Sequence, residues 1–309
     1  MNKDLKKKAR TKDRLAVNKR EKYATYSVTS KDGTIIGYRQ LGHGPGVVLV
    51  QGAMGTALNF MELAGALANT FTVYVPDRRG RGLSPFPYDE DYTIQKDVED
   101  LDALFAKTGA HSIFGLSSGA LISLQAALTL PSIHKAVIYE PPLFVNGAPT
   151  ALLRRYEKEM NEGKLAAALI TAMWATQMGP AIFDVIPRWL LERLTNKMMI
   201  QEDKTATSAD VTMRMLAPTL RYDFHLVTEM NGKLESFKAI HAEVLLLGGS
   251  KSPAFLKGDL DALEKVLPHV TRIEFPGLGH SAAWNYDRQR NPHGDPERVA
   301  QELRRFFAG

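Results

Sequence analysis

Short apolar runs alternate with segments of helical spacing along most of the chain, and this alternation limits the folds that the sequence can adopt. Residues 47–50 (VVLV) and 244–247 (VLLL) are entirely apolar, which is typical of central strands in a parallel sheet. Segments such as 93–108 place apolar residues on one side of a helix. Strands and helices that alternate in this way predict an α/β fold with a doubly wound, mostly parallel sheet.

The alternation is interrupted between residues 143 and 238. This block shows no strand pattern and four helical patterns, over 150–161, 164–177, 188–200 and 208–230. It holds eight of the eleven methionines and two of the three tryptophans. The strand pattern returns at residues 244–247. The order predicts a helical insertion, with a core formed by 23–142 and 239–309 and a cap formed by 143–238.

The first 22 residues differ from the rest of the chain in charge. They carry ten Lys or Arg residues against three acidic ones, a net charge of +7, whereas the whole chain carries +5. We expect a basic, solvated and partly helical tail, and contact with nucleic acid or an anionic membrane is the alternative. No aromatic residue occurs before Tyr23, which argues against a surface that stacks bases.

Composition excludes several other classes of protein. No apolar run approaches the roughly 18 residues that a membrane-spanning helix needs, and no apolar segment of a secretory signal follows the basic residues. The chain has no cysteine, which excludes disulfides and thiolate metal sites. The glycines at 42–46 precede a strand and do not open a helix, unlike a dinucleotide-binding loop. We expect a cytoplasmic protein without a metal or a cofactor.

Residues 111–130 combine a strand pattern, a tight turn and a helical pattern. The turn reads GLSSG (115–119) and fits G-x-S-x-G. Small residues two positions on either side of the serine allow a sharp turn from strand to helix, which holds the hydroxyl out at the carboxyl edge of the sheet. The motif alone is weak, but the strand and the helix supply the context that it requires. Ser117 is therefore the predicted nucleophile.

A serine hydroxyl needs a base within hydrogen-bond reach. His280 follows the last predicted strand in a loop that reads PGLGHS, and such a loop suits a group that accepts and returns a proton. Seven other histidines lack this placement and are expected to be structural or exposed to solvent: His43, His111, His134, His225, His241, His269 and His293.

The sequence resembles the α/β-hydrolase superfamily over nearly all of residues 24–308. The resemblance is carried, in order, by VVLVQGAMG, VPDRRGRGLS, FGLSSGA, IYEPPL, LLLGG and FPGLGHS. It implies an α/β-hydrolase fold with a helical cap, or lid, and it implies that Ser117 and His280 are the nucleophile and the base. It says much less about the substrate.

The acid of the expected triad departs from the common pattern. Most relatives carry it shortly after the strand that corresponds to 244–247, but here the loop reads GGSKSP (248–253) and holds no carboxylate. Asp259 and Asp261 come later, at the start of a predicted helix, where carboxylates favour the helix dipole. Glu140 is the better candidate, because some family members place the acid at this neighbouring strand end and a buried carboxylate needs a partner. The alternative is that Glu140 pairs with backbone or with an arginine elsewhere.

The resemblance also implies an oxyanion hole made by the backbone N–H groups of Ala53 and Ser118. Gln51 stands where many relatives have a histidine, and we expect it to shape this loop. Residues 77–82 (DRRGRG) are expected to form a structural turn whose arginines tie loops together.

The candidate pocket residues are Met54, Trp174 and Met178. The methionine-rich and tryptophan-rich cap would cover Ser117, and flexible thioethers adapt to irregular apolar ligands. The alternative is that these side chains only pack the core of the cap.

These residues predict a carboxylesterase-like serine hydrolase that cleaves an ester or similar acyl bond of a small, largely apolar substrate. A serine nucleophile argues against epoxide hydrolase and haloalkane dehalogenase activity. Carbon–carbon bond hydrolysis and cofactor-free oxygenase or perhydrolase chemistry use the same residues and remain alternatives. A non-catalytic or slow ligand receptor is a further class, supported by the missing acid at the usual position. The sequence does not define the oligomeric state.

Overall fold

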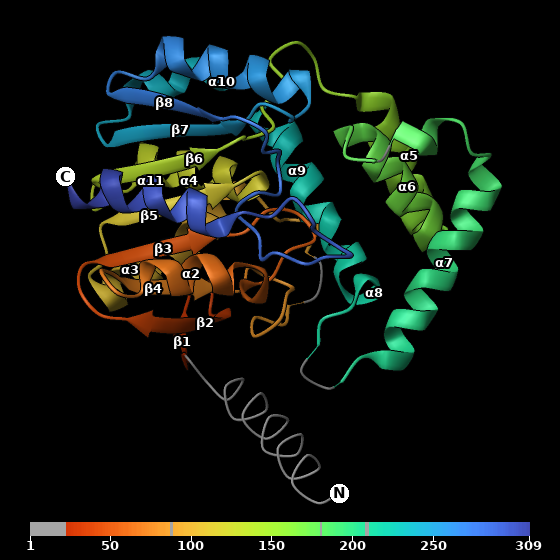
Figure 1. The fold of residues 1–309 in the computed structure, drawn as a ribbon, viewed down its shortest axis with the longest axis horizontal. Helices are drawn as coiled ribbons and strands as arrows, with labels where there is room; N and C mark the ends of the chain where they lie inside the picture. Colours follow the sequence, from red (N-terminus) through yellow and green to blue (C-terminus); the bar gives the residue numbers. More distant parts are fainter. Residues whose placement is uncertain (1–22, 87–88, 180, 208–209) are drawn as a thin grey trace, which may run out of the picture.

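The structure is a computed structural model that describes residues 23–86, 89–179, 181–207 and 210–309. Within these residues eight strands form one sheet (Figure 1), in the order β1-β2-β4-β3-β5-β6-β7-β8. The strands are β1 (Ala24–Thr29), β2 (Ile35–Gly42), β3 (Gly46–Val50), β4 (Thr72–Pro76), β5 (Ser112–Leu116), β6 (Lys135–Tyr139), β7 (Glu243–Gly249) and β8 (Val270–Phe275). The predicted basic tail, 1–22, lies outside the described residues.

The sheet has a switch point at its centre. Neighbouring strands from β3 to β8 run parallel, whereas β1 and β2 pair antiparallel. The chain passes from β3 to β4 in one direction and then crosses back to β5 on the other side of β3. The prediction of a doubly wound, mostly parallel sheet is confirmed. Sheets of this kind bind ligands in the crevice at the carboxyl ends of the strands where the order reverses, which here is beside β3 and β5.

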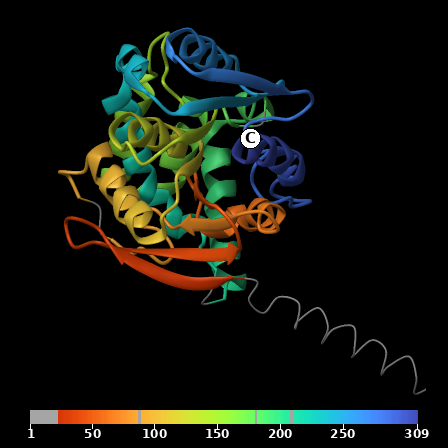
Figure 2. The ribbon, with the colours of Figure 1, turned by 90° about the vertical axis from the view of Figure 1, so that its left-hand side faces the viewer.

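Helices cover both faces of the sheet. The α-helices are α2 (Met61–Leu67), α3 (Ile94–Thr108), α4 (Ser118–Thr129), α5 (Thr150–Asn161), α6 (Leu165–Thr176), α7 (Arg188–Thr205), α8 (Met213–Leu216), α9 (Leu220–Met230), α10 (Ala254–Val266) and α11 (Pro296–Ala308), with short 3-10 helices η1 (Ala57–Phe60), η2 (Ala181–Asp184), η3 (Ala217–Thr219) and η4 (Leu234–Ala239). Figure 2 shows α2 and α11 on one side of the sheet and α3 on the other. None of the helices in the described part of the chain has both the length and the apolar character needed to cross a membrane.

The alternation of side chains along each strand builds two hydrophobic cores. Val48 and Val50 of β3 pack in the core that includes side chains of α3, α4, α9 and α10. Val47 and Leu49 point to the opposite face and pack with side chains of α2 and α11. Because successive residues of a strand face opposite sides, a strand buried on both faces must be apolar throughout, which explains the continuous run VVLV.

Helices α5 to α9 lie in the sequence between the paired strands β6 and β7. Figure 1 shows α5, α6 and α7 standing to one side of the sheet, and residues of these helices share a third hydrophobic cluster. Helix α9 joins this cluster to the core, because Leu220 and Phe224 pack with side chains of α5, α6 and α7 while Leu226 and Met230 pack with those of α4.

Two helices differ from the sequence-based expectation. The helical pattern over 208–230 is realised as α8, η3 and α9, with Pro218 inside η3. Helix α10 begins at Ala254, directly after Pro253, so Asp259 is not at a helix start as predicted. Its buried carboxylate instead accepts hydrogen bonds from the N–H groups of Phe144 and Val145, both at 2.9 Å.

Candidate active site

Ser117 occupies a strained turn between β5 and α4. Its backbone angles are φ 58° and ψ −125°, a conformation that is costly for a residue with a side chain. A Cβ atom at Gly115 would lie 2.3 Å from Ser123 Oγ, and one at Gly119 would lie 2.4 Å from the carbonyl oxygen of Val50. The two glycines of the motif are therefore required by close approach of the chain on both sides of the serine.

Glu140 and His280 lie together. The Nδ1 atom of His280 is 2.7 Å from Oε2 of Glu140, whose side chain is fully buried. The other carboxylate oxygen of Glu140 accepts the N–H of Gly249 at 2.7 Å. Glu140 therefore has both kinds of partner that the sequence suggested, the histidine and a backbone N–H group. Since Nδ1 is engaged, Nε2 is the ring nitrogen available to the cavity that His280 and Ser117 both line.

Contacts from neighbouring strands hold the histidine loop. The hydroxyl of Tyr139, at the end of β6, donates to the carbonyl oxygen of Gly279 at 2.9 Å. The backbone N–H of Lys251 donates to the carbonyl oxygen of Leu278 at 2.9 Å, and Ser250 Oγ accepts the N–H of Gly277 at 2.8 Å. The loop after β7 therefore positions His280 although it holds no triad acid.

The backbone N–H groups of Ala53 and Ser118 have no hydrogen-bond acceptor within the part of the chain that the structure describes. Ser118 begins α4, so its N–H lies at the positive end of the helix. The side chain of Gln51 is fully buried, and its amide donates to the carbonyl oxygen of Pro76 at 2.8 Å. This bond ties the end of β3 to the end of β4, as expected of a residue that shapes the loop.

A buried ion cluster supports the same loop. Asp223, on α9, pairs with Arg78 at 2.7 Å and with Arg81 at 2.6 Å. Arg81 also donates to the carbonyl oxygen of Gly52 at 2.7 Å, and Ser118 Oγ donates to Asp223 at 2.7 Å. Burial raises the pKa of Asp223, but Arg81 and Arg78 outweigh it, so this pKa lies below its ordinary value. The arginines of 77–82 tie loops together, as expected, and their partner Asp223 could not be identified from the sequence.

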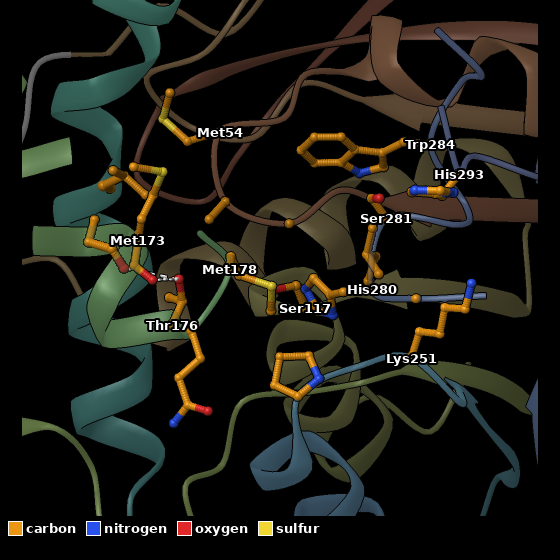
Figure 3. Close-up of a pocket in the computed structure, with 18 of the residues that line it drawn as sticks. Met54, Ser117, Met173, Thr176, Met178, Lys251, His280, Ser281, Trp284 and His293 are labelled. Carbon is orange, nitrogen blue, oxygen red and sulfur yellow. Dashed lines mark hydrogen bonds between the residues drawn. The ribbon is translucent and has the colours of Figure 1, made fainter. Parts of the chain in front are cut away.

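A cavity of about 730 Å³ lies above Ser117 and His280. Figure 3 shows Met54 and Met173 on one side of it and Trp284, His293 and Lys251 on the other. A second cavity of about 40 Å³ also reaches Ser117 and His280 and is lined by apolar side chains that include Phe144, Val227 and Phe255. The site thus consists of a large chamber and a small apolar one, which meet at the serine.

The predicted pocket residues separate into two groups. Met54 and Met178 line the large cavity, whereas Trp174 does not belong to the described lining of either cavity. On α6 the lining positions are 169, 172, 173 and 176, which is one helical face, and the residue after 173 is rotated by about 100° from it. The ring of Trp174 lies instead against the guanidinium of Arg188, 5.1 Å from the ring centroid. The expectation for Trp174 is therefore corrected.

Sequence reasoning missed the polar residues of the large cavity other than Ser117 and His280, among them Lys251, Trp284 and His293. Lys251 lies in the loop after β7, whereas Trp284 and His293 lie in the same connection as His280, between β8 and α11. Nothing in the local sequence indicates that the two segments meet at the cavity. Among the described residues, no group of three His, Asp or Glu side chains is placed to hold a metal ion.

The comparison with known families agrees with this geometry. The model of the alpha/beta hydrolase family matches residues 47–302. The chain belongs to the α/β-hydrolase family. It is 28% identical in sequence to an α/β-hydrolase from Sphaerobacter thermophilus of known structure, with a TM-score of 0.71 over 91% of this chain and 100% of that one.

Two curated relatives match over shorter segments. The uncharacterized hydrolase YraK of Bacillus subtilis is 36% identical over 36% of this α/β-hydrolase and 42% of its own length. N-formylmaleamate deformylase of Pseudomonas putida is 34% identical over 33% of this chain and 39% of its own length. The matches therefore span about two fifths of these relatives.

Proposed function

We propose that this α/β-hydrolase is a carboxylesterase-like serine hydrolase that cleaves an ester or similar acyl bond through an acyl-enzyme on Ser117. The observation that carries the proposal is the hydrogen bond between His280 and the buried Glu140. His280 and Ser117, whose backbone is strained, both line the large cavity. This arrangement supplies the base and the orienting carboxylate that a serine nucleophile requires.

In the proposed reaction, Nε2 of His280 accepts the hydroxyl proton while Ser117 Oγ attacks the carbonyl carbon of the substrate. Glu140 holds the ring and stabilises the imidazolium that forms. The N–H groups of Ala53 and Ser118 bind the developing oxyanion. His280 then protonates the leaving group, and a water molecule, activated by the same histidine, hydrolyses the acyl-enzyme.

The two cavities suggest where the acyl group and the leaving group of a substrate would bind. The small cavity of about 40 Å³ has room for about three water-sized groups, which suits a short acyl chain. The leaving group would then occupy the large cavity beneath the cap, beside Met54 and Met178. The name of N-formylmaleamate deformylase describes the removal of a one-carbon acyl group, which agrees with a short acyl side.

A receptor without catalysis is the second class considered. Its main support was the lack of a carboxylate in 248–253, and the hydrogen bond between His280 and the carboxylate of Glu140 weakens that argument. A measurement of catalytic turnover separates the hydrolase from the receptor.

The test combines labelling and turnover. A fluorophosphonate probe is expected to form one covalent adduct, on Ser117, and the wild type is expected to hydrolyse 4-nitrophenyl acetate faster than the butyrate. Ser117→Ala should abolish both signals, whereas Ser236→Ala, which alters an exposed serine, should keep both. An adduct on another residue, or turnover that survives in Ser117→Ala, would contradict the proposal.

A further inference from the structure

The large cavity carries a set of hydrogen-bond donors that the catalytic steps do not use. Lys251, Trp284 and His293 line it together, and Figure 3 shows all three on the side opposite Met173. The ammonium group and the indole N–H can only donate, and a histidine ring can donate in either protonation state. This side of the cavity, which we call the donor wall, is defined by these three residues.

The donor wall lacks a negative partner. The ionisable side chains that line the cavity within the described chain are Lys251, His280 and His293, and no Asp or Glu lines it. Lys251 is exposed, and its ammonium group forms no ion pair or hydrogen bond with another described residue. The indole Nε1 atom of Trp284 is buried and has no hydrogen-bond partner among the described residues. A buried donor without a partner is costly, and an acceptor on a bound molecule would satisfy this one after a shift of the indole ring toward the cavity that it lines.

The wall is held in place relative to the catalytic residues. The backbone of Lys251 is hydrogen-bonded to Leu278, in the histidine loop. Trp284 packs on the loop after β3 that carries Ala53, since a Cβ atom at Gly55 of this loop would lie 3.3 Å from the ring of Trp284. The Asn291 side chain donates to the carbonyl oxygen of Ser281 at 3.0 Å, which ties the segment that carries His293 to the same loop. The backbone positions that carry the three donors are therefore held beside the histidine loop, and the exposed residues Lys251 and His293 line the cavity from there.

We propose that the donor wall binds a carboxylate on the leaving group, so that the substrate is a short acyl ester or amide of a carboxylate-bearing alcohol or amine. The inference rests on the proposed function, because it assigns the leaving group to the large cavity. Lys251 supplies the positive charge, and Trp284 and His293 supply directed hydrogen bonds. Met54 and Met178 cover the apolar body of the same group.

The test compares 3-acetoxybenzoate with its methyl ester, whose leaving group lacks the charge and carries one more methyl group, and scores release of the acetyl group. The wild type should show a kcat/KM about tenfold or more higher for the acid, as expected for a hydrogen bond to a charged group. Lys251→Met should lose that preference through a higher KM for the acid, and Lys251→Arg should restore it. Lys265→Met, at an exposed site near the end of α10, is the matched control and should behave as the wild type.

Binding separates this inference from the proposed function. Calorimetry with Ser117→Ala measures the dissociation constants of the same two compounds without turnover. Tighter binding of the acid, lost in the double variant with Lys251→Met, supports the donor wall even if neither compound is hydrolysed. Equal affinity for the acid and the methyl ester would overturn the inference. If the wild type hydrolyses neither compound but the acid still binds more tightly, only the proposed reaction is contradicted.

Discussion

Replacement of Glu140 by glutamine removes one negative charge from the site and keeps the shape of the side chain. In the transition state His280 carries a positive charge roughly 4 Å from that carboxylate, and at an effective dielectric constant of about 20 their attraction is about 4 kcal/mol. This corresponds to a loss of roughly 10³ in kcat. The amide of glutamine can also present a donor to Nδ1, which favours the wrong tautomer of the ring.

The assay is the initial rate of 4-nitrophenyl acetate hydrolysis at saturating substrate, together with the thermal unfolding temperature. Glu140→Gln should lower kcat by about 10³ with little change in KM, because the charge acts on the transition state. Glu243→Gln, at the exposed beginning of β7, should leave kcat unchanged. A kcat for Glu140→Gln within tenfold of the wild type, in a protein that unfolds at the same temperature, would refute the role given to Glu140.

Three further predictions concern the surroundings of the site. Asp223→Asn leaves Arg78 and Arg81 without their shared carboxylate, so the unfolding free energy should fall by about 3–5 kcal/mol in denaturant titrations, and kcat should fall with it. The pKa of Asp223 is lowered in the fold, so its contribution to stability is present above the ordinary aspartate pKa of about 3.9 and is lost as the pH falls through the lowered value. In acid titrations the unfolding free energies of the wild type and the variant should therefore approach each other. Phe255→Ala enlarges the small cavity and should shift the preference from acetyl to butyryl esters, measured as the ratio of kcat/KM values; an unchanged ratio would place the acyl group elsewhere. Deletion of residues 1–22 should leave ester turnover unchanged, and any salt-sensitive binding to DNA or anionic vesicles should be lost with that segment.

Local patterns were sufficient to predict the strands, the turn at Ser117 and the order of the helices. The run VVLV at 47–50 has its composition because both of its faces are buried, and this property is visible in the sequence. The glycines around Ser117 are likewise needed for a local turn. Glu140 could be proposed as the partner of His280 because some members of the family place the acid at this strand end and because a buried carboxylate needs a partner.

Contacts between distant segments could not be predicted in this way. Asp259 reaches the turn at Phe144 across 115 positions, and its role depends on where α10 begins. Trp174 and Met173 are adjacent and equally suited to an apolar pocket, and only the rotation of α6 separates them. The partner of Arg78 and Arg81 lies on α9 at Asp223, more than 140 positions away.

The position of α9 has a practical consequence for exchanging lids between relatives. One side of this helix packs in the core with α4, and its Asp223 contacts Ser118, whose N–H is assigned to the oxyanion hole. A chimera spliced at residues 143 and 238 would remove that carboxylate together with the lid. Grafts that end before α8 would replace α5, α6 and α7 and keep Asp223, the carboxylate that pairs with the buried Arg78 and Arg81.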